Sequence, residues 1–144
     1  MKKYLGFSLL ELLVVISIIG ILVSIGTVAF TTAQKTGRDS RRRSDIKAMQ
    51  DAFEQYRAEN STYEACSTMA DYNSGSGSLM PGGLPVDPRN SGDYVYNTAN
   101  GCTVSGYCVC AYLESGTGNA DLPVTPGTCS YNSGGDYYCL TNLQ

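Results

Sequence analysis

The sequence predicts an α+β fold in which a long N-terminal helix packs on a small antiparallel sheet that disulfides hold. Three observations support this prediction. An apolar run extends from Phe7 to Phe30 with Glu11 as its only charge, an amphipathic helical pattern follows to about Asn60, and every cysteine lies from Cys66 onward. Once the first thirty residues are set aside, about 114 remain, which is enough for one small core.

The run from Phe7 to Phe30 is long enough to cross a membrane. A helix rises about 1.5 Å per residue, so the run reaches roughly 36 Å, against a hydrocarbon core of roughly 30 Å. Lys2 and Lys3 precede it, which keeps the short N-terminus cytoplasmic by the positive-inside tendency. A plain single-pass anchor is one interpretation. A carboxylate inside a membrane segment costs a few kcal/mol, however, so Glu11 calls for a partner or a function.

The residues that open the run differ from an ordinary secretory signal, because the small residue, Gly6, comes before the apolar segment. This GFSLLE motif, from Gly6 to Glu11, and the run behind it resemble the class III signal of type IV pilins and type II secretion pseudopilins. The resemblance is strongest from residue 1 to about residue 63. It implies that a prepilin peptidase cuts between Gly6 and Phe7 and that the new N-terminus at Phe7 is methylated. It also implies that Glu11 attracts the N-terminal amine of a neighbouring subunit during assembly.

The resemblance implies a pilin-like chain of four parts. These are a cleaved leader at 1–6, a transmembrane and filament-core helix at 7–30, the amphipathic half of the same helix at 31–60, and a Gly-, Ser- and Tyr-rich sheet domain at 61–144. Helical spacing supports the third part independently. The face expected to be buried consists of Ile46, Met49, Phe53 and Tyr56, and the residues expected to point elsewhere are Lys47, Gln50, Asp51 and Glu54.

Arg41, Arg42 and Arg43 form a basic cluster in the amphipathic half. Basic clusters can bind nucleic acid or anionic lipid. This one is short, contains no interleaved aromatic residue, and is flanked by Asp39 and Asp45. We therefore expect a solvated helix face or a salt bridge to the next subunit, and no specific nucleic-acid site.

From Ser61 onward the composition is typical of short strands joined by turns. A Gly-rich connector is expected at 73–83, followed by a rigid proline turn at 84–88. The expected strands are Tyr94–Tyr96, Gly106–Glu114 and Tyr137–Thr141. The proline turn and the first two strands are similar to the region after the long helix in major pseudopilins and related short pilins. A proline turn that feeds an unrelated sheet is the alternative.

Six cysteines favour disulfides in an exported domain. They are Cys66, Cys102, Cys108, Cys110, Cys129 and Cys139. Zinc is the competing interpretation, but the sequence has no histidine and no C-x-x-C pair. A turn signal at 132–136 predicts that Cys129 bonds to Cys139. Cys108 and Cys110 stand too far apart on one strand face for an easy bond, so each is expected to find a separate partner among Cys66 and Cys102.

Several kinds of site are not expected. Without histidine, the usual serine or cysteine triads and imidazole metal ligands cannot form, so we expect no enzyme and no cofactor. Asp71, Asn73 and Gly75 are spaced like the first half of a calcium loop, but Gly82 stands where the twelfth-position glutamate is required. Calcium stays an alternative. The eleven tyrosines could form an adhesive or subunit-contact surface, or fill the core.

Two classes of function follow. The first is a structural subunit of a type IV pilus-like filament, a helical homo-oligomer whose N-terminal helices pack together with the help of an inner-membrane assembly platform. A major pseudopilin of a type II secretion system belongs to the same class. The second is a surface-anchored adhesive minor pilin. In each case the chain is a single-pass cell-membrane protein before assembly, and an extracellular pilus or periplasmic pseudopilus contains it afterwards.

Overall fold

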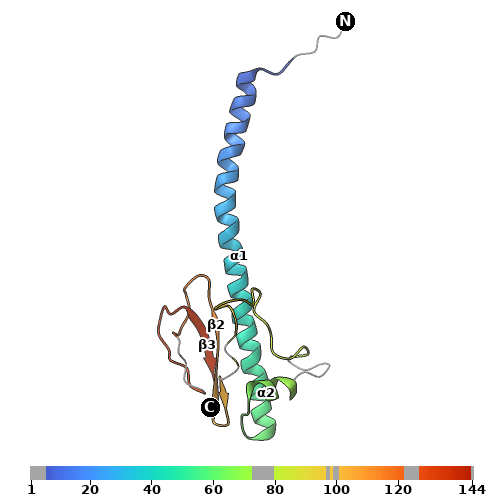
Figure 1. Ribbon diagram of the computed structural model, residues 1–144, viewed down its shortest axis with the longest axis vertical. Helices are drawn as coiled ribbons and strands as arrows, with labels where there is room; N and C mark the ends of the chain where they lie inside the picture. Colours follow the sequence, from blue (N-terminus) through green and yellow to red (C-terminus); the bar gives the residue numbers. More distant parts are fainter. Residues whose placement is uncertain (1–5, 73–79, 97, 99–100, 122–126, 144) are drawn as a thin grey trace. The chain divides into compact units, whose positions relative to one another are not determined.

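The computed structural model describes residues 6–72, 80–96, 98, 101–121 and 127–143. Lys2 and Lys3, most of the Gly-rich connector, and Asn73 and Gly75 of the calcium-like spacing lie outside the described residues. The chain divides into two compact units, 1–35 and 36–144, which are described separately. The described elements, in order, are α1 (Leu9–Asn60), α2 (Cys66–Tyr72), β1 (Cys102–Thr103), β2 (Gly106–Tyr112) and β3 (Tyr137–Thr141) (Figure 1).

Helix α1 ends where the periodic pattern predicts. The Asn60 side chain donates a hydrogen bond to the Tyr56 carbonyl at 3.0 Å, and Ser61 adopts a left-handed backbone with φ of 64°. Such a left-handed residue is a common helix stop. The structure confirms the pilin-like α+β fold, in which an apolar N-terminal helix is followed by a small antiparallel sheet with disulfides.

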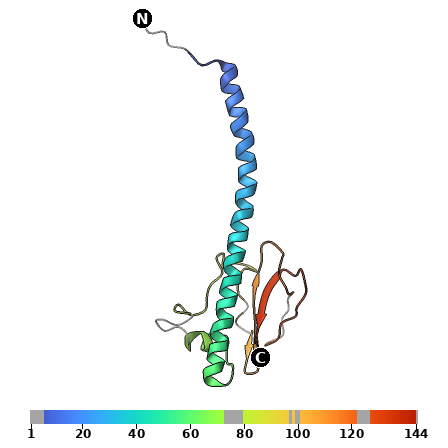
Figure 2. The same ribbon diagram turned by 180° about the vertical axis from the view of Figure 1, so that it is seen from behind.

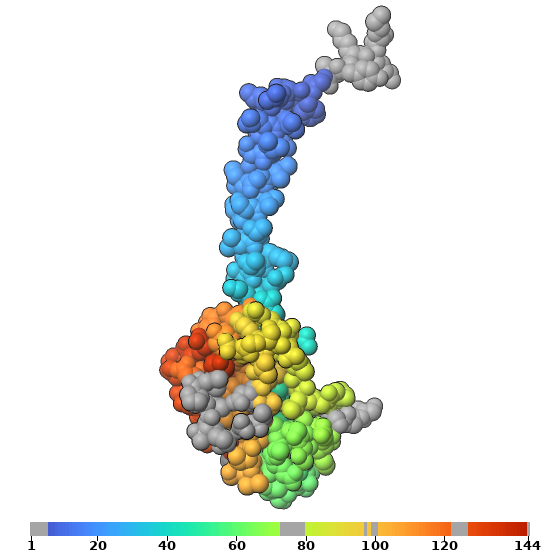
Figure 3. Space-filling model, in the orientation of Figure 1, coloured from blue at the N-terminus to red at the C-terminus, as the bar shows by residue number. Residues whose placement is uncertain are grey.

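The sheet of the second unit has the order β1-β2-β3, and both pairings are antiparallel. Strands β2 and β3 run beside the C-terminal part of α1 in both ribbon views (Figure 2). In the space-filling view, the yellow segment around residues 80–96 borders the orange and red C-terminal segments (Figure 3). Parts that are far apart in the sequence therefore share one surface.

Strand β2 is buried on both faces. One face carries Tyr107, Val109 and Ala111 and packs in the main core with α1, while the opposite face carries Cys108 and Cys110. The predicted α1 face lies in the main core and is fully buried or nearly so, at Ile46, Met49, Phe53 and Tyr56. A strand covered on both sides explains why β2 reads as a continuous run rather than an alternation.

The prediction that Gln50 points away from the core is wrong. Gln50 is buried, and its side-chain amide donates to the carbonyl of Thr141 in β3 at 2.7 Å. Strand β3 lies beside this side of α1, and its partly buried Thr141 carbonyl accepts the donor that Gln50 supplies. Gln50 thus forms a hydrogen bond to the sheet, and the helical period alone could not predict this contact.

The strand predictions are partly correct. Tyr137–Thr141 is β3, and Gly106 begins β2, but β2 ends at Tyr112 because the Leu113 and Glu114 N–H groups bond to Asp136 and Asp39. The strand predicted at Tyr94–Tyr96 is absent, and only an isolated bridge joins Ser91 to Tyr94. Helix α2 and the two-residue β1 were not predicted, since both are too short to show a period.

The disulfides join Cys66 to Cys102, Cys108 to Cys129 and Cys110 to Cys139. Cys108 and Cys110 bond to different partners, as expected, but those partners are not Cys66 or Cys102. The predicted bond between Cys129 and Cys139 is also wrong. Cys139 lies directly opposite Cys110 in the register of β2 and β3, with 4.1 Å between their Cα atoms, so strand pairing rather than the nearby turn decides its partner.

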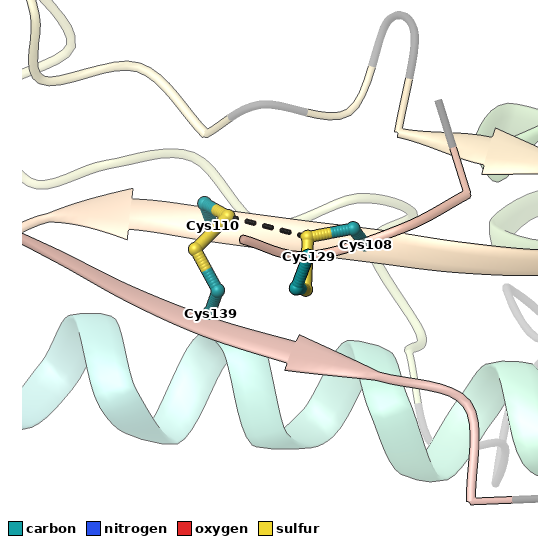
Figure 4. A group of neighbouring side chains, drawn as sticks. All are labelled: Cys108, Cys110, Cys129 and Cys139. Carbon is teal, nitrogen blue, oxygen red and sulfur yellow. Dashed lines mark hydrogen bonds between the residues drawn. A yellow bond between two sulfur atoms is a disulfide. The ribbon is translucent and has the colours of Figure 1, made fainter. Parts of the chain in front are cut away.

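Two disulfides lie side by side on the outer face of β2 (Figure 4). The Sγ atoms of Cys108 and Cys110 are 3.6 Å apart, and the four sulfurs lie within 4.8 Å of one another. Such a cluster resembles a metal site, but every one of these sulfurs is already bonded to another sulfur. With Ala120, the cystines form a second small core that fixes the C-terminal segments to the sheet.

The outer edge of β3 is closed by neighbouring groups. The side-chain amide of Asn119 accepts from the Cys139 N–H at 2.7 Å and donates to the Cys139 carbonyl at 2.9 Å. Tyr137 exchanges backbone hydrogen bonds with Ala120 at 3.0 Å. The approach is so close that a Cβ at Gly118 would overlap the Tyr137 carbonyl oxygen. The edge that would otherwise offer free backbone groups is therefore occupied.

Candidate functional site

The first unit contains the GFSLLE motif and the start of α1. Gly6, Phe7 and Ser8 precede the helix, and Leu12 N–H donates to the Ser8 carbonyl at 3.2 Å. The Glu11 carboxylate accepts from the Ser8 N–H at 3.3 Å, which is one half of a capping box. The bond between Gly6 and Phe7 thus lies in exposed, non-helical backbone.

Glu11 is exposed in the first turn of α1. A carboxylate at this position is favoured by the partial positive charge of the helix N-terminus. In the described residues, no cationic side chain forms an ion pair with it. The hydrogen bond from Ser8 uses a single oxygen, so the carboxylate can still accept from another donor.

From residue 7 onward, the apolar side chains of the first unit are all exposed. Their exposed fractions run from 46% at Val14 to 82% at Phe7. Within the described residues, α1 is the one helix that is long and apolar enough to span a membrane. An exposed apolar surface of this extent needs lipid or other apolar helices around it.

The five hydroxyl groups between residues 17 and 32 are satisfied within α1. Each donates to a backbone carbonyl three or four residues earlier, at 2.8 to 3.1 Å, and the donors are Ser17, Ser24, Thr27, Thr31 and Thr32. A hydroxyl bonded in this way presents little unsatisfied polarity to its surroundings. The segment therefore suits an environment without water, a feature that the spacing of apolar residues alone does not reveal.

The prediction for the basic cluster is wrong for Arg42, which lies inside the second unit. Its side chain is 0% exposed, and it donates to both oxygens of Asp87 at 2.7 and 3.1 Å. It also donates to Asp39 at 2.8 Å and to Glu114 at 2.9 Å. Loops distant in sequence bring in two of these carboxylates, so the helix pattern could not reveal the site.

Arg38 completes this network. Its guanidinium forms two hydrogen bonds to Glu114, each at 2.6 Å, while the Glu114 and Ser115 N–H groups donate to Asp39 at 3.0 Å. The network fixes the segment after β2, and the turn that contains Asp87, to α1. Arg43 instead donates to the Thr117 carbonyl at 2.9 Å, and Arg41 stays exposed.

The network holds its carboxyl groups in the ionised form. Hydrogen bonds from Arg38, followed by those from Arg42, outweigh burial and lower the pKa of Glu114 to about 2. Burial raises the pKa of Asp39, but the N–H groups of Glu114 and Ser115 and the guanidinium of Arg42 leave that pKa below its ordinary value. Both groups stabilise the fold when charged.

We expect the second unit to lose stability in acid. Because the Glu114 pKa is lower in the folded chain than in the unfolded chain, the unfolded chain binds more protons, and stability rises with pH. The contribution is present above the ordinary value of 4.5 and is lost as the pH falls toward about 2. Full protonation should cost about 3 kcal/mol. Urea unfolding of a chain truncated to 34–144, expected to be soluble, measures this between pH 6 and 2.

Glu114→Gln is the control for this prediction. It removes the titrating group, so its free energy of unfolding should depend less on pH than that of the original chain. Equal pH dependence in the two chains would show that Glu114 does not carry the effect.

The tyrosines divide between core and surface. Tyr63 and Tyr107 are buried, and both hydroxyls bond to the Glu54 carboxylate, at 3.0 and 2.7 Å. Tyr72 and Tyr131 are about half exposed, at 50% and 54%. Tyr63 and Tyr107 thus fill the core, whereas Tyr72 and Tyr131 lie at the surface.

The comparison with protein families matched residues 1–27 to the prokaryotic N-terminal methylation motif. The match contains Gly6, Phe7 and Glu11 and covers the first part of the exposed apolar segment. Comparison with curated proteins and with solved structures found no match.

Proposed function

We propose that this chain, a type IV pilin-like protein with a class III signal and an N-terminal methylation motif, is the structural subunit of a type IV pilus-like filament. One observation carries the proposal. The methylation motif opens an apolar segment, residues 7–30, whose side chains are all exposed and whose only charge is Glu11. Packing such helices against one another would bury an apolar surface that the single chain leaves open.

In this proposal, cleavage after Gly6 frees an amine at Phe7, and the amine pairs with Glu11 of a neighbouring subunit. Both groups are costly to hold in lipid without a partner. Pairing offsets the two desolvation costs and requires adjacent helices to be staggered along the filament. The same contact would then set the axial register of the subunits. Methylation at Phe7 leaves the amine positively charged and so preserves the pairing.

Before assembly, the chain is proposed to be a single-pass protein of the cell membrane, with leader 1–6 and a spanning segment at 7–30. A prepilin peptidase removes the leader, and an inner-membrane platform assembles the homo-oligomer. Residues 31–60 and 61–144 form the outward part. The motif and the fold are typical of structural proteins rather than enzymes, and nothing in the proposal requires a cofactor.

Two alternatives share parts of this description. A major pseudopilin of a type II secretion system would use the same motif and the same helix packing, and the location of the filaments separates it from a pilus subunit. A surface-anchored adhesive minor pilin is less well supported. Glu11 favours a polymerising subunit, and Tyr63, Tyr96 and Tyr107 are buried rather than displayed.

We expect the mature chain to begin at Phe7. The Gly6–Phe7 bond lies in exposed backbone before α1, where a peptidase can reach it. Intact-mass analysis of assembled protein should show the loss of residues 1–6, the loss of six hydrogens from three disulfides, and the gain of one methyl group. Gly6→Leu, which enlarges the residue before the cut, should stay uncleaved. An assembled chain that still begins at Met1 would contradict the proposal.

A further inference from the structure

Among the described arginines of the second unit, Arg41 has the weakest contacts with other side chains. Arg38 and Arg42 bond to carboxylates at 2.6 to 3.1 Å, and Arg43, Arg57 and Arg89 lie over tyrosine rings at 4.1 to 5.2 Å. Arg41 has only a 3.8 Å contact with Asp45, and its side chain is 65% exposed. The same Asp45 oxygen already accepts the Tyr96 hydroxyl at 2.7 Å.

A surface of complementary character lies on the same unit. The rings of Tyr94, Tyr112 and Tyr137 form a row of edge-to-face contacts, with 5.1 Å between successive centroids. Asp93 and Asp136 are exposed beside this row. We call these five residues the Tyr–Asp surface.

The carboxylates of the Tyr–Asp surface are not neutralised within the chain. In the described residues, neither Asp93 nor Asp136 forms an ion pair. Their charges act on the neighbouring rings, with Asp136 the largest cause of the raised pKa of Tyr112. Burial and then Asp93 raise the pKa of Tyr137. Arg42 and Arg89 both lie over Tyr94, at 4.7 and 4.1 Å from the ring centroid, and in the described part of the chain no cation is stacked on Tyr112 or Tyr137.

We infer that Arg41 of one copy docks on the Tyr–Asp surface of a neighbouring copy. A guanidinium is attracted both by tyrosine ring faces and by carboxylates, and this chain already places arginines over three different tyrosines. The occupant is a second copy because the loose cation and the uncompensated carboxylates belong to the same chain. This inference rests on the proposed filament, which brings copies side by side.

Charge reversal with rescue tests the contact in the full chain, in cells that contain a prepilin peptidase and an assembly platform. The variants are Arg41→Glu, the pair Asp93→Arg with Asp136→Arg, and the chain that carries all three changes. Sheared filaments are measured relative to subunit in the cell envelope. Either reversal should lower the filament fraction about tenfold, and the three changes together should restore most of it. Lys47→Glu is the matched control, since Lys47 is also an exposed α1 cation, and it should leave the fraction unchanged.

Every outcome of this experiment either supports or overturns the contact between Arg41 and the Tyr–Asp surface. Full assembly by Arg41→Glu, or a loss that the three changes do not reverse, overturns the contact while filaments of the original chain uphold the proposed function. Absence of filaments from the original chain overturns both. Where a reversal lowers the amount of subunit with intact disulfides, Arg41→Ala and Asp136→Asn replace it, because they remove charge without adding the opposite one. Full assembly by both of these variants likewise overturns the contact.

Discussion

Replacing Glu11 with Ala is expected to abolish filaments while export, cleavage after Gly6 and folding of the second unit continue. In the proposed assembly, the Phe7 amine of each incoming subunit meets the Glu11 carboxylate of its neighbour. Without that carboxylate, the amine enters an apolar bundle unpaired, which costs several kcal/mol per subunit. Since the loss recurs at every added subunit, filament yield should fall by at least about 100-fold. Electron microscopy and quantification of sheared filaments measure it.

Glu11→Gln is the informative companion. Glutamine can still accept the Ser8 N–H bond, because capping boxes use Glu or Gln at this position. It cannot carry a negative charge. If Glu11 acts through pairing with an amine, Glu11→Gln should fail almost as fully as Glu11→Ala. If the Gln variant assembles as well as the original chain while the Ala variant fails, Glu11 serves to cap α1, and the pairing is excluded.

Replacing Arg42 with Met is expected to cost the second unit about 3 to 5 kcal/mol. Methionine fills similar space but leaves Asp39, Asp87 and Glu114 in the same buried site with much less compensating charge. A buried carboxylate that loses its partner must either remain charged at high cost or take up a proton. Urea unfolding of the chain truncated to 34–144, with its disulfides intact, measures the loss at neutral pH.

Arg41→Met is the matched control, one residue away on the same helix. Its side chain is exposed and makes only a 3.8 Å contact, so the monomer should lose less than about 0.5 kcal/mol. At low pH the carboxyl groups become protonated, so the difference in free energy of unfolding between Arg42→Met and the original chain should become smaller. Equal stability losses for the two arginines would mean that the buried network does not hold the second unit together.

Local patterns predicted α1 well. Its apolar run, its end near Asn60 and its buried face from Ile46 to Tyr56 depend on spacing within one helix, which the sequence displays directly. The GFSLLE motif could also be recognised from the sequence, since its small residue, apolar run and single charge are contiguous. Strand β3 was predicted for the same reason, because Tyr137–Thr141 is one short segment of contiguous residues that follows a turn signal.

Features that depend on distant segments were not predicted. The partner of Cys139 is set by the register between β2 and β3, whereas the turn signal at 132–136 pointed to Cys129. Arg42 looks like any solvated arginine until the turn at Asp87 and the segment after β2 are brought to α1. The helical period shows which residues face inward, but it cannot show which polar groups of other segments contact them.

The closed edge of β3 affects how copies of the sheet domain can pack against one another. In the proposed filament, copies are held at high local concentration, where an open strand edge would template cross-β aggregation between them. The Asn119 amide occupies both backbone groups of Cys139, Ala120 occupies those of Tyr137, and β1 at the other edge is only two residues long. In the proposed filament, the closed edge therefore disfavours strand exchange between copies and permits dense packing of the sheet domains.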